Sequence, residues 1–157
     1  MENRQLLAIQ IACCVIAWGA IARAYVAPRL AQLDLHRAVR PWIAPQMFRI
    51  IGVTLLAKNV AGAGLDPDFA HWVAYGDFVT CVLAIASFVA LKRPGALGIG
   101  LAATTTVIGA ADLVHNLVLG MRVNAANDLG PAWFVVAIVV PGMLVAHVGA
   151  AFRLLRR

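Results

Sequence analysis

The chain has 157 residues, of which 62% are hydrophobic and 13% are charged, and its formal net charge is +6 at pH 7. Soluble domains carry about 45–50% apolar and about 25% charged residues, so a soluble domain of this size could not bury so much apolar surface. The basic residues flank apolar segments instead of forming a basic face interleaved with aromatic residues, which argues against binding of nucleic acid. The composition predicts an all-α, polytopic transmembrane helical bundle.

Five apolar segments predict five membrane spans within a single transmembrane domain over residues 1–157. A span needs about 20 apolar residues. The predicted spans are, in chain order, about 5–27, 46–63, 70–91, 96–121 and 131–154. The first apolar run is too long for the core of a signal peptide, so we interpret it as a span that stops at Pro28. Residues 28–45 are predicted to form a basic loop, and Pro141 is expected to kink the last helix.

The short segment 46–63 decides between five spans and four. Arg49 near one end and Lys58 near the other can both snorkel to the membrane surface, so the segment can still span. With five spans and the N-terminus outside, ten Lys and Arg residues lie inside and three lie outside. The inner set is Arg23, Arg29, Arg37, Arg40, Arg49, Lys92, Arg93, Arg153, Arg156 and Arg157, and the outer set is Arg4, Lys58 and Arg122. With four spans the division becomes six against seven. The positive-inside rule therefore favours five spans with the C-terminus inside. We expect the membrane to be a bacterial inner membrane.

Four polar residues inside the predicted spans are candidates for a functional site. Asp112, His115 and Asn116 stand at i, i+3 and i+4, so they share one face of a helix. Asp77 belongs to the preceding span, and at the helical rise it lies about 10 Å below the outer surface, against about 13 Å for Asp112. Ionisable side chains within spans are costly and by default mark function. We therefore predict a buried Asp/His ligand-binding site in the outer half of the bundle.

Lys58 and Asn59, at the outer end of the second predicted span, could join this site. Lys58 could then pair with Asp77 or Asp112. The carboxyl and imidazole groups would bind the polar head of a small amphipathic ligand, such as a lipid, or exchange protons with a quinone. Two other functions stay open: a proton-coupled transporter or channel subunit, and a structural or accessory subunit in which the polar cluster joins helices. The expected partners are membrane lipids and such a ligand, with a homo-oligomer or a larger complex also open.

The sequence indicates neither a metal site nor a catalytic motif. Cys13, Cys14 and Cys81 lie inside apolar runs, which is not the pattern of a disulfide framework. His71 and His115 both lie toward the outer side, so a haem held by these two histidines is geometrically open, although no haem-binding motif accompanies them. Nucleotide-binding Gly-rich loops, Gly-x-Ser-x-Gly and zinc-protease motifs are absent from the sequence. Catalytic residues and cofactors therefore stay unassigned, and whether the protein is an enzyme stays open.

Small residues recur at a spacing of four in the fourth predicted span. Gly98, Ala102 and Thr106 follow this spacing, as do Thr105 and Gly109. Small residues at this spacing let helix backbones approach closely in lipid, so we expect close packing along this helix.

Several short motifs follow one another from Arg49 onward. They are Arg49-Ile-Ile-Gly52 with Leu55-Leu56, Phe69-Ala70 after an Asp/Pro turn, Gly76-Asp77 followed by Leu83-Ala84, and a Lys92-Arg93 turn before an Ala-rich helix. With these motifs, residues 49–121 resemble the DoxX-like group of small bacterial membrane proteins. The resemblance implies a four-helix membrane protein in which segment 46–63 is a true span. For some members of that group it also implies quinone-linked sulfur or redox chemistry. The first apolar segment is additional to the pattern of the group.

Overall fold

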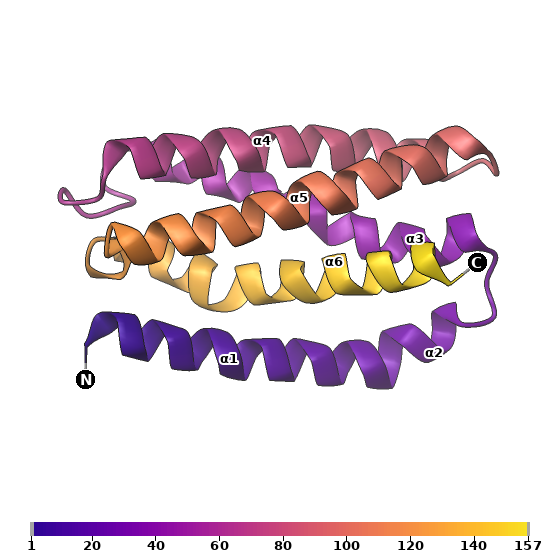
Figure 1. Cartoon of the computed structure of the whole chain (residues 1–157), viewed down its shortest axis with the longest axis horizontal. Helices are drawn as coiled ribbons and strands as arrows, with labels where there is room; N and C mark the ends of the chain where they lie inside the picture. The colour runs from indigo at the N-terminus through magenta and orange to yellow at the C-terminus, as the bar shows by residue number, and fades with distance from the viewer. Residues whose placement is uncertain (1, 157) are drawn as a thin grey trace.

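The computed structural model describes residues 2–156, which form an all-α bundle of five helices lying side by side (Figure 1). The two ends of the chain lie at opposite ends of the bundle, here called the amino end and the carboxyl end (Figure 1). Four helices are long and apolar enough to cross a membrane: Asn3–Leu30, Pro67–Ala90, Ala96–Arg122 and Gly130–Leu155. The remaining helix is Leu35–Leu56. Arg157, which the sequence assigns to the inner side, lies outside the described residues.

The first and last helices each contain a π-helical turn two residues before a proline. The first helix consists of α1 (Asn3–Ile21), η1 (Ala22–Val26) and α2 (Ala27–Leu30). The last helix consists of η4 (Gly130–Ala132), a short α-helical link, η5 (Val135–Val139) and α6 (Val140–Leu155). Proline lacks the N–H that would bond to the preceding turn, so carbonyls there need other donors. Arg29 Nη1 donates to the Tyr25 carbonyl at 2.5 Å, and Trp18 Nε1 donates to the Ile138 carbonyl at 3.0 Å.

The second helix lies earlier in the chain than the sequence predicts. Of the predicted loop 28–45, residues 28–30 complete the first helix and residues from Leu35 onward belong to the second helix, which ends at Leu56, short of the predicted end at residue 63. It consists of α3 (Leu35–Ile43) and a 13-residue 3₁₀ helix, η2 (Ala44–Leu56). Pro41 and Pro45 cannot donate to an α-helical ladder. The 3₁₀ form rises about 2.0 Å per residue against about 1.5 Å for an α-helix, so the whole segment reaches about 40 Å. That length exceeds a hydrocarbon core of about 30 Å.

The 3₁₀ geometry of η2 divides its side chains into stripes three residues apart. The buried stripe consists of Gln46, Arg49 and Gly52. The neighbouring stripe, Pro45, Phe48, Ile51 and Thr54, lines a groove beside the first helix. Residues at i and i+3 eclipse one another in a 3₁₀ helix, whereas they diverge by about 60° in an α-helix. The backbone form therefore decides which side chains of this helix reach the core.

Helices α4 (Pro67–Ala90) and α5 (Ala96–Arg122) pack closely along their length, as the small residues predict. A Cβ atom added at Gly98 would lie 3.1 Å from the Ala90 backbone, so a larger residue there would push the helices apart. Ser87 Oγ and Thr105 Oγ1 share a hydrogen bond of 2.7 Å across the same interface. The close approach of α4 and α5 brings together Asp77 of α4 and Asp112 of α5.

Candidate functional site

Arg49 of η2 is the centre of a buried ion cluster. Its side chain is fully buried, whereas the sequence placed it near a helix end, from where it could snorkel to the surface. Nε donates to Asp77 Oδ1 at 2.6 Å, and Nη2 pairs with the carboxylates of both Asp77 and Asp112. Nη1 donates to the Gly109 carbonyl at 2.8 Å. One guanidinium therefore joins three helices: η2, α4 and α5.

The two carboxylates meet close to the middle of their helices. Asp77 stands ten residues after Pro67, about 15 Å along α4 at 1.5 Å per residue. Asp112 stands ten residues before Arg122, so it lies about 15 Å from the same end of α5. Both side chains keep a little accessible surface, 13% for Asp77 and 15% for Asp112. In a membrane with a hydrocarbon core of about 30 Å, the cluster would lie at the depth of this core, where unpaired charge is most costly.

Three glycines make room for the ionisable side chains of this region. In each case the glycine Cα lies against a charged or imidazole group of the next helix along the chain. The pairs are Gly52 with the Asp77 carboxylate, Gly76 with the Asp112 carboxylate, and Gly109 with the His147 ring. At Gly109 an added Cβ would lie 2.6 Å from the imidazole Cε1 and 2.7 Å from Thr80 Cγ2. Any larger residue at these positions would therefore displace a member of the polar cluster.

His147 of α6 extends the cluster to a fourth helix. Only 3% of this residue is exposed. Its two ring nitrogens, Thr80 Oγ1 and Gln46 Oε1 have no hydrogen-bond partner among the described residues. Gln46 Nε2 donates to the Met143 carbonyl at 3.0 Å, which ties η2 to α6. Buried polar atoms are usually paired, so this part of the core has unused capacity for hydrogen bonds.

The other residues predicted for the site do not all converge. Asn116 joins the cluster, because its Nδ2 donates to Asp112 Oδ2 at 3.1 Å. His115 points away: it is exposed, and its ring stands edge-on to Trp72 at a centroid distance of 5.9 Å.

The cation that pairs with the carboxylates differs from the one that the sequence suggested. Lys58 and Asn59 are exposed in the connection after η2. Lys58 makes no ion pair with any residue between 2 and 156. The cation that meets the two carboxylates is Arg49. Two features of the sequence could have indicated that Arg49 is buried. Pro41 and Pro45 favour a non-α helix, and Gln46, Arg49 and Gly52 are spaced three residues apart.

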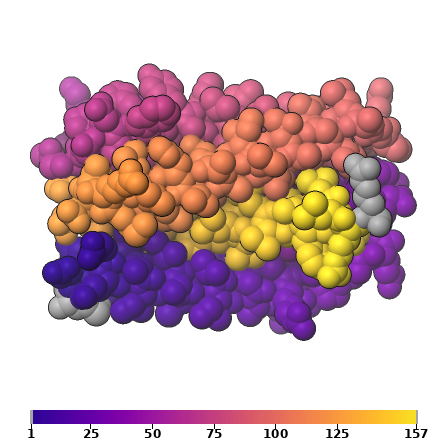
Figure 2. All heavy atoms as spheres, in the orientation of Figure 1, coloured from indigo at the N-terminus to yellow at the C-terminus, as the bar shows by residue number. Residues whose placement is uncertain are grey.

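An apolar cavity of about 330 Å³ lies beside Asn116, between the first helix, α5 and the last helix. Figure 2 shows the first helix and α5 close together at the amino end of the bundle. The polar residues that line the cavity are Arg4, Asn116 and Asn124, and the rest of the lining is apolar. Asn116 Oδ1 is buried and has no hydrogen-bond partner within residues 2–156. The cavity is therefore mainly apolar, and one of the residues that line it, Asn116, has a buried acceptor without a partner.

The comparisons with known proteins identify a family for almost the whole chain. The model of the Domain of unknown function (DUF8737) matches residues 6–156. The chain belongs to this family. No curated protein and no solved structure matches it. The match includes the first helix, and none of the comparisons supports the resemblance to the DoxX-like group. The fold and the family together describe a multi-span membrane protein of unknown function with a buried Arg/Asp/His cluster.

The histidines considered for haem are both exposed. His71 Nδ1 lies 2.7 Å from the Pro67 carbonyl, and its ring stacks on Tyr75 at 6.2 Å. Neither His71 nor His115 lines the cavity beside Asn116. In the part of the chain that the structure describes, no group of three or more His, Cys, Asp or Glu side chains is placed to hold a metal ion.

The charges of the cluster do not cancel when both carboxylates are ionised. One guanidinium then faces two negative groups, and one bound proton makes the cluster neutral. A buried ion pair is stable only when its geometry satisfies the remaining donors and acceptors. Here Arg49 donates through Nε and both Nη atoms, and Asn116 donates to the second carboxylate. The arrangement can hold a proton, and it fixes the orientation of Asn116.

Proposed function

We propose that the protein binds a small amphipathic ligand, such as a lipid or a quinol, in the cavity beside Asn116. The observation that carries the proposal is that Asn116, whose buried Oδ1 has no partner among the described residues, lines a cavity that is apolar apart from Arg4 and Asn124. Ligand pockets typically measure about 300–1,000 Å³ and combine apolar walls with a few placed polar groups. A volume of about 330 Å³ is enough for a single ring or for part of an acyl chain.

The ion cluster sets the polarity of the ligand. Asn116 Nδ2 donates to the Asp112 carboxylate, which is held in turn by Arg49. This bond directs the amide so that Oδ1 remains as an acceptor, because an ionised carboxylate can only accept. The ligand must then supply a donor, such as a hydroxyl group. A quinol or a hydroxyl-bearing lipid has one, whereas an oxidised quinone has only carbonyl acceptors. A resemblance of residues 49–121 to the DoxX-like group would favour the quinol.

The distribution of basic residues supports one orientation of the chain across the membrane. With Arg49 removed from the count, nine basic residues remain for the inner side, against Arg4, Lys58 and Arg122. We therefore infer five spans, with the N-terminus outside and the C-terminus inside. We further propose that the membrane is a bacterial inner membrane. In that orientation the cavity opens toward the outer surface, where Arg4 and Asn124 line it. The ligand would enter from the outer leaflet.

The test is to identify the small molecules that co-purify with the protein in mild detergent, by organic extraction and mass spectrometry. Ala12 lines the cavity, so Ala12→Phe should fill it and remove the bound molecule. The adjacent Cys13 is exposed and does not line the cavity, so Cys13→Phe is the matched control and should keep the molecule. Equal amounts of every extracted molecule in wild type, Ala12→Phe and Asn116→Leu would refute the proposal.

A second function, proton transfer, is favoured by one further contact. His147 and Arg49 meet at Gly109: the imidazole packs against its Cα, and the guanidinium donates to its carbonyl. An imidazole ring can both accept and donate a proton, and the two carboxylates can share one. Proton flux into liposomes that is lost with both Asp112→Asn and His147→Gln would support this function. No flux above that of protein-free liposomes would rule it out.

A further inference from the structure

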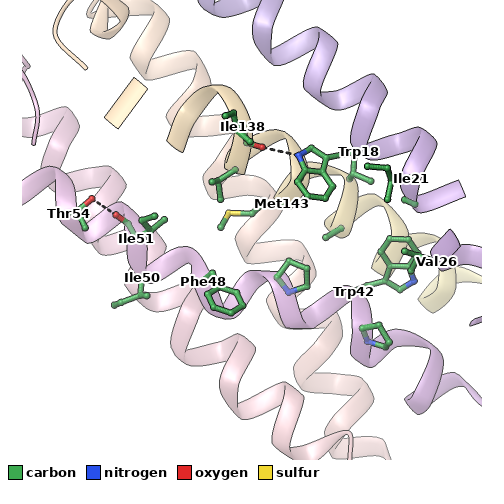
Figure 3. Close-up of a pocket in the computed structure, with 17 residues that line it drawn as sticks. Trp18, Ile21, Val26, Trp42, Phe48, Ile50, Ile51, Thr54, Ile138 and Met143 are labelled. Atoms are coloured by element: carbon green, nitrogen blue, oxygen red, sulfur yellow. Dashed lines mark hydrogen bonds between the residues drawn. The ribbon is translucent and has the colours of Figure 1, made fainter. Parts of the chain in front are cut away.

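A second and larger cavity takes no part in either function proposed above. It measures about 840 Å³ and lies between the first, second and last helices. Figure 3 shows Trp18, Met143 and Phe48 facing this space, with Val26 and Trp42 toward one end. Apart from Thr54 and the indole nitrogens, the side chains that line it are apolar. It is a groove with an open side, because Phe48 in its wall is 67% exposed.

The groove is long enough for an acyl chain. On the first helix it extends from Trp18 to Val26, on the last helix from Ile138 to Ala146, and on the second helix from Pro41 to Thr54. These stretches span about 12 Å on each of the two α-helical walls and about 24 Å on the mainly 3₁₀ second helix. Half of a hydrocarbon core of about 30 Å is about 15 Å. The groove therefore accommodates the length of an acyl chain within one leaflet.

Each of the three helices that line the groove carries an arginine on its groove-lining face. These arginines lie past the groove, toward the carboxyl end of the bundle. Arg29 follows Val26 by three residues, Arg37 precedes Pro41 by four, and Arg153 follows Ala146 by seven. Residues at these spacings continue one face of a helix. The three arginines therefore lie on the groove side of their helices, beyond the end of the groove.

The three arginines differ in what they bind. Arg153 Nη2 donates to the Leu30 carbonyl at 2.7 Å and to the Leu33 carbonyl at 3.3 Å, which ties down the connection between the first two helices. Arg29 is exposed, and within the described part of the chain its side chain makes only a local bond to the Tyr25 carbonyl and a cation–π contact with the Tyr25 ring. Arg37 is exposed and makes no side-chain hydrogen bond or ion pair within residues 2–156. Arg29 and Arg37 are thus available to an anion.

We infer that the groove holds an acyl chain of an anionic phospholipid, whose phosphate lies between Arg29 and Arg37. Guanidinium groups bind phosphate through paired hydrogen bonds, and juxtamembrane basic residues attract anionic lipids. A neutral ligand would leave these charges unmatched. A second copy of the chain would need an acidic segment at this level, and Asp34 is the only acidic residue between positions 3 and 65. The site is separate from the cavity beside Asn116, so either proposal can fail alone.

The experiment is a titration of the full chain in detergent, followed by native mass spectrometry. The probes are phosphatidylglycerol, phosphatidylcholine and inorganic phosphate. We expect one tightly bound phosphatidylglycerol, binding of phosphatidylcholine at least about tenfold weaker, and no competition by inorganic phosphate. Equal binding of the two lipids, or full competition by phosphate alone, would overturn the inference. So would a dimer whose formation displaces the lipid.

Two kinds of variant locate the lipid. The double variant Arg29→Gln/Arg37→Gln should weaken binding of phosphatidylglycerol at least about tenfold while leaving the thermal transition near that of wild type, because both side chains are exposed. The control Lys92→Gln/Arg93→Gln removes two exposed charges from a different connection at the same end and should leave binding unchanged. Equal losses in the two double variants would show a general attraction instead of a site. Gly142→Leu should weaken both lipids, because a Cβ there would lie 3.2 Å from the Trp18 ring inside the groove.

Discussion

The replacement of Arg49 by methionine tests whether the ion cluster holds the bundle together. Methionine has a similar length and no charge, so Arg49→Met removes the guanidinium without leaving a large cavity. The Asp77 and Asp112 carboxylates would then lie near each other without a cation, and the Gly109 carbonyl would lose its side-chain donor. Both carboxylates are more than four-fifths buried, so water can solvate them only in part.

The size of the effect follows from the charge that Arg49→Met leaves uncompensated. Removing one partner of a buried ion pair costs about 3–5 kcal/mol, because the other charge stays buried without its counterpart. Arg49 serves two carboxylates at once, so we expect a loss of about 5 kcal/mol in the free energy of unfolding. In a chain of this length about 1 kcal/mol moves Tm by about 2–4 °C. The predicted decrease in Tm is therefore about 10–20 °C.

The assay is thermal unfolding of the purified protein in mild detergent, followed by tryptophan fluorescence and by circular dichroism. The control is Arg93→Met, which removes an exposed arginine from the turn after α4 and should change the stability by less than about 0.5 kcal/mol. The triple variant Arg49→Met/Asp77→Asn/Asp112→Asn should recover most of the loss, because it leaves no uncompensated charge. A Tm for Arg49→Met within about 2 °C of wild type would refute the placement of Arg49 between the two carboxylates.

The remaining predictions concern close packing, topology and one long-range hydrogen bond. Gly76→Ala should destabilise the fold by about 3 kcal/mol, since the methyl group would fall on a carboxylate, whereas Gly100→Ala in open space should stabilise it by about 0.5–1 kcal/mol in the same melting assay. In a cysteine-free background, a membrane-impermeant thiol reagent applied to intact spheroplasts should label Asn59→Cys but not Asp34→Cys; labelling of both would contradict a second helix that spans. Trp18→Phe removes the indole bond to the last helix and should lower the stability by about 1 kcal/mol, measured by the same thermal scan.

The sequence predicts the parts of the site that lie on regular α-helices. Asp112 and Asn116, at i and i+4, do share a face, because α5 is α-helical through this region. His115 was assigned to the same face, but at i+3 it lies about 60° to one side of Asp112, whereas Asn116 lies about 40° to the other. The cluster faces the Asn116 side, so His115 turns outward to Trp72. Spacing alone could not choose between these two sides.

Arg49 was misplaced because its helix has a different period. An α-helical reading starts the second span after the prolines and puts Arg49 at its end, where a charge is cheap. In the structure the helix begins at Leu35 and tightens to the 3₁₀ form at Ala44, so Arg49 falls inside the bundle. His147 was missed for a different reason. Its burial depends on the space left by Gly109 on another helix, and a single sequence does not reveal that pairing.

Burial of the charged groups of the cluster costs free energy, and a purely structural role would not require this cost. Ion pairs replaced by well-packed apolar residues often leave proteins equally stable, and small residues alone can hold helices together in lipid. This chain already has such packing where Gly98 meets α4. Yet Gly52, Gly76 and Gly109 each lie against an ionisable group of a neighbouring helix, so polar side chains occupy three of the close helix contacts. An arrangement of this kind is better explained by what it orients, the Asn116 acceptor at the edge of an apolar cavity, than by stability alone.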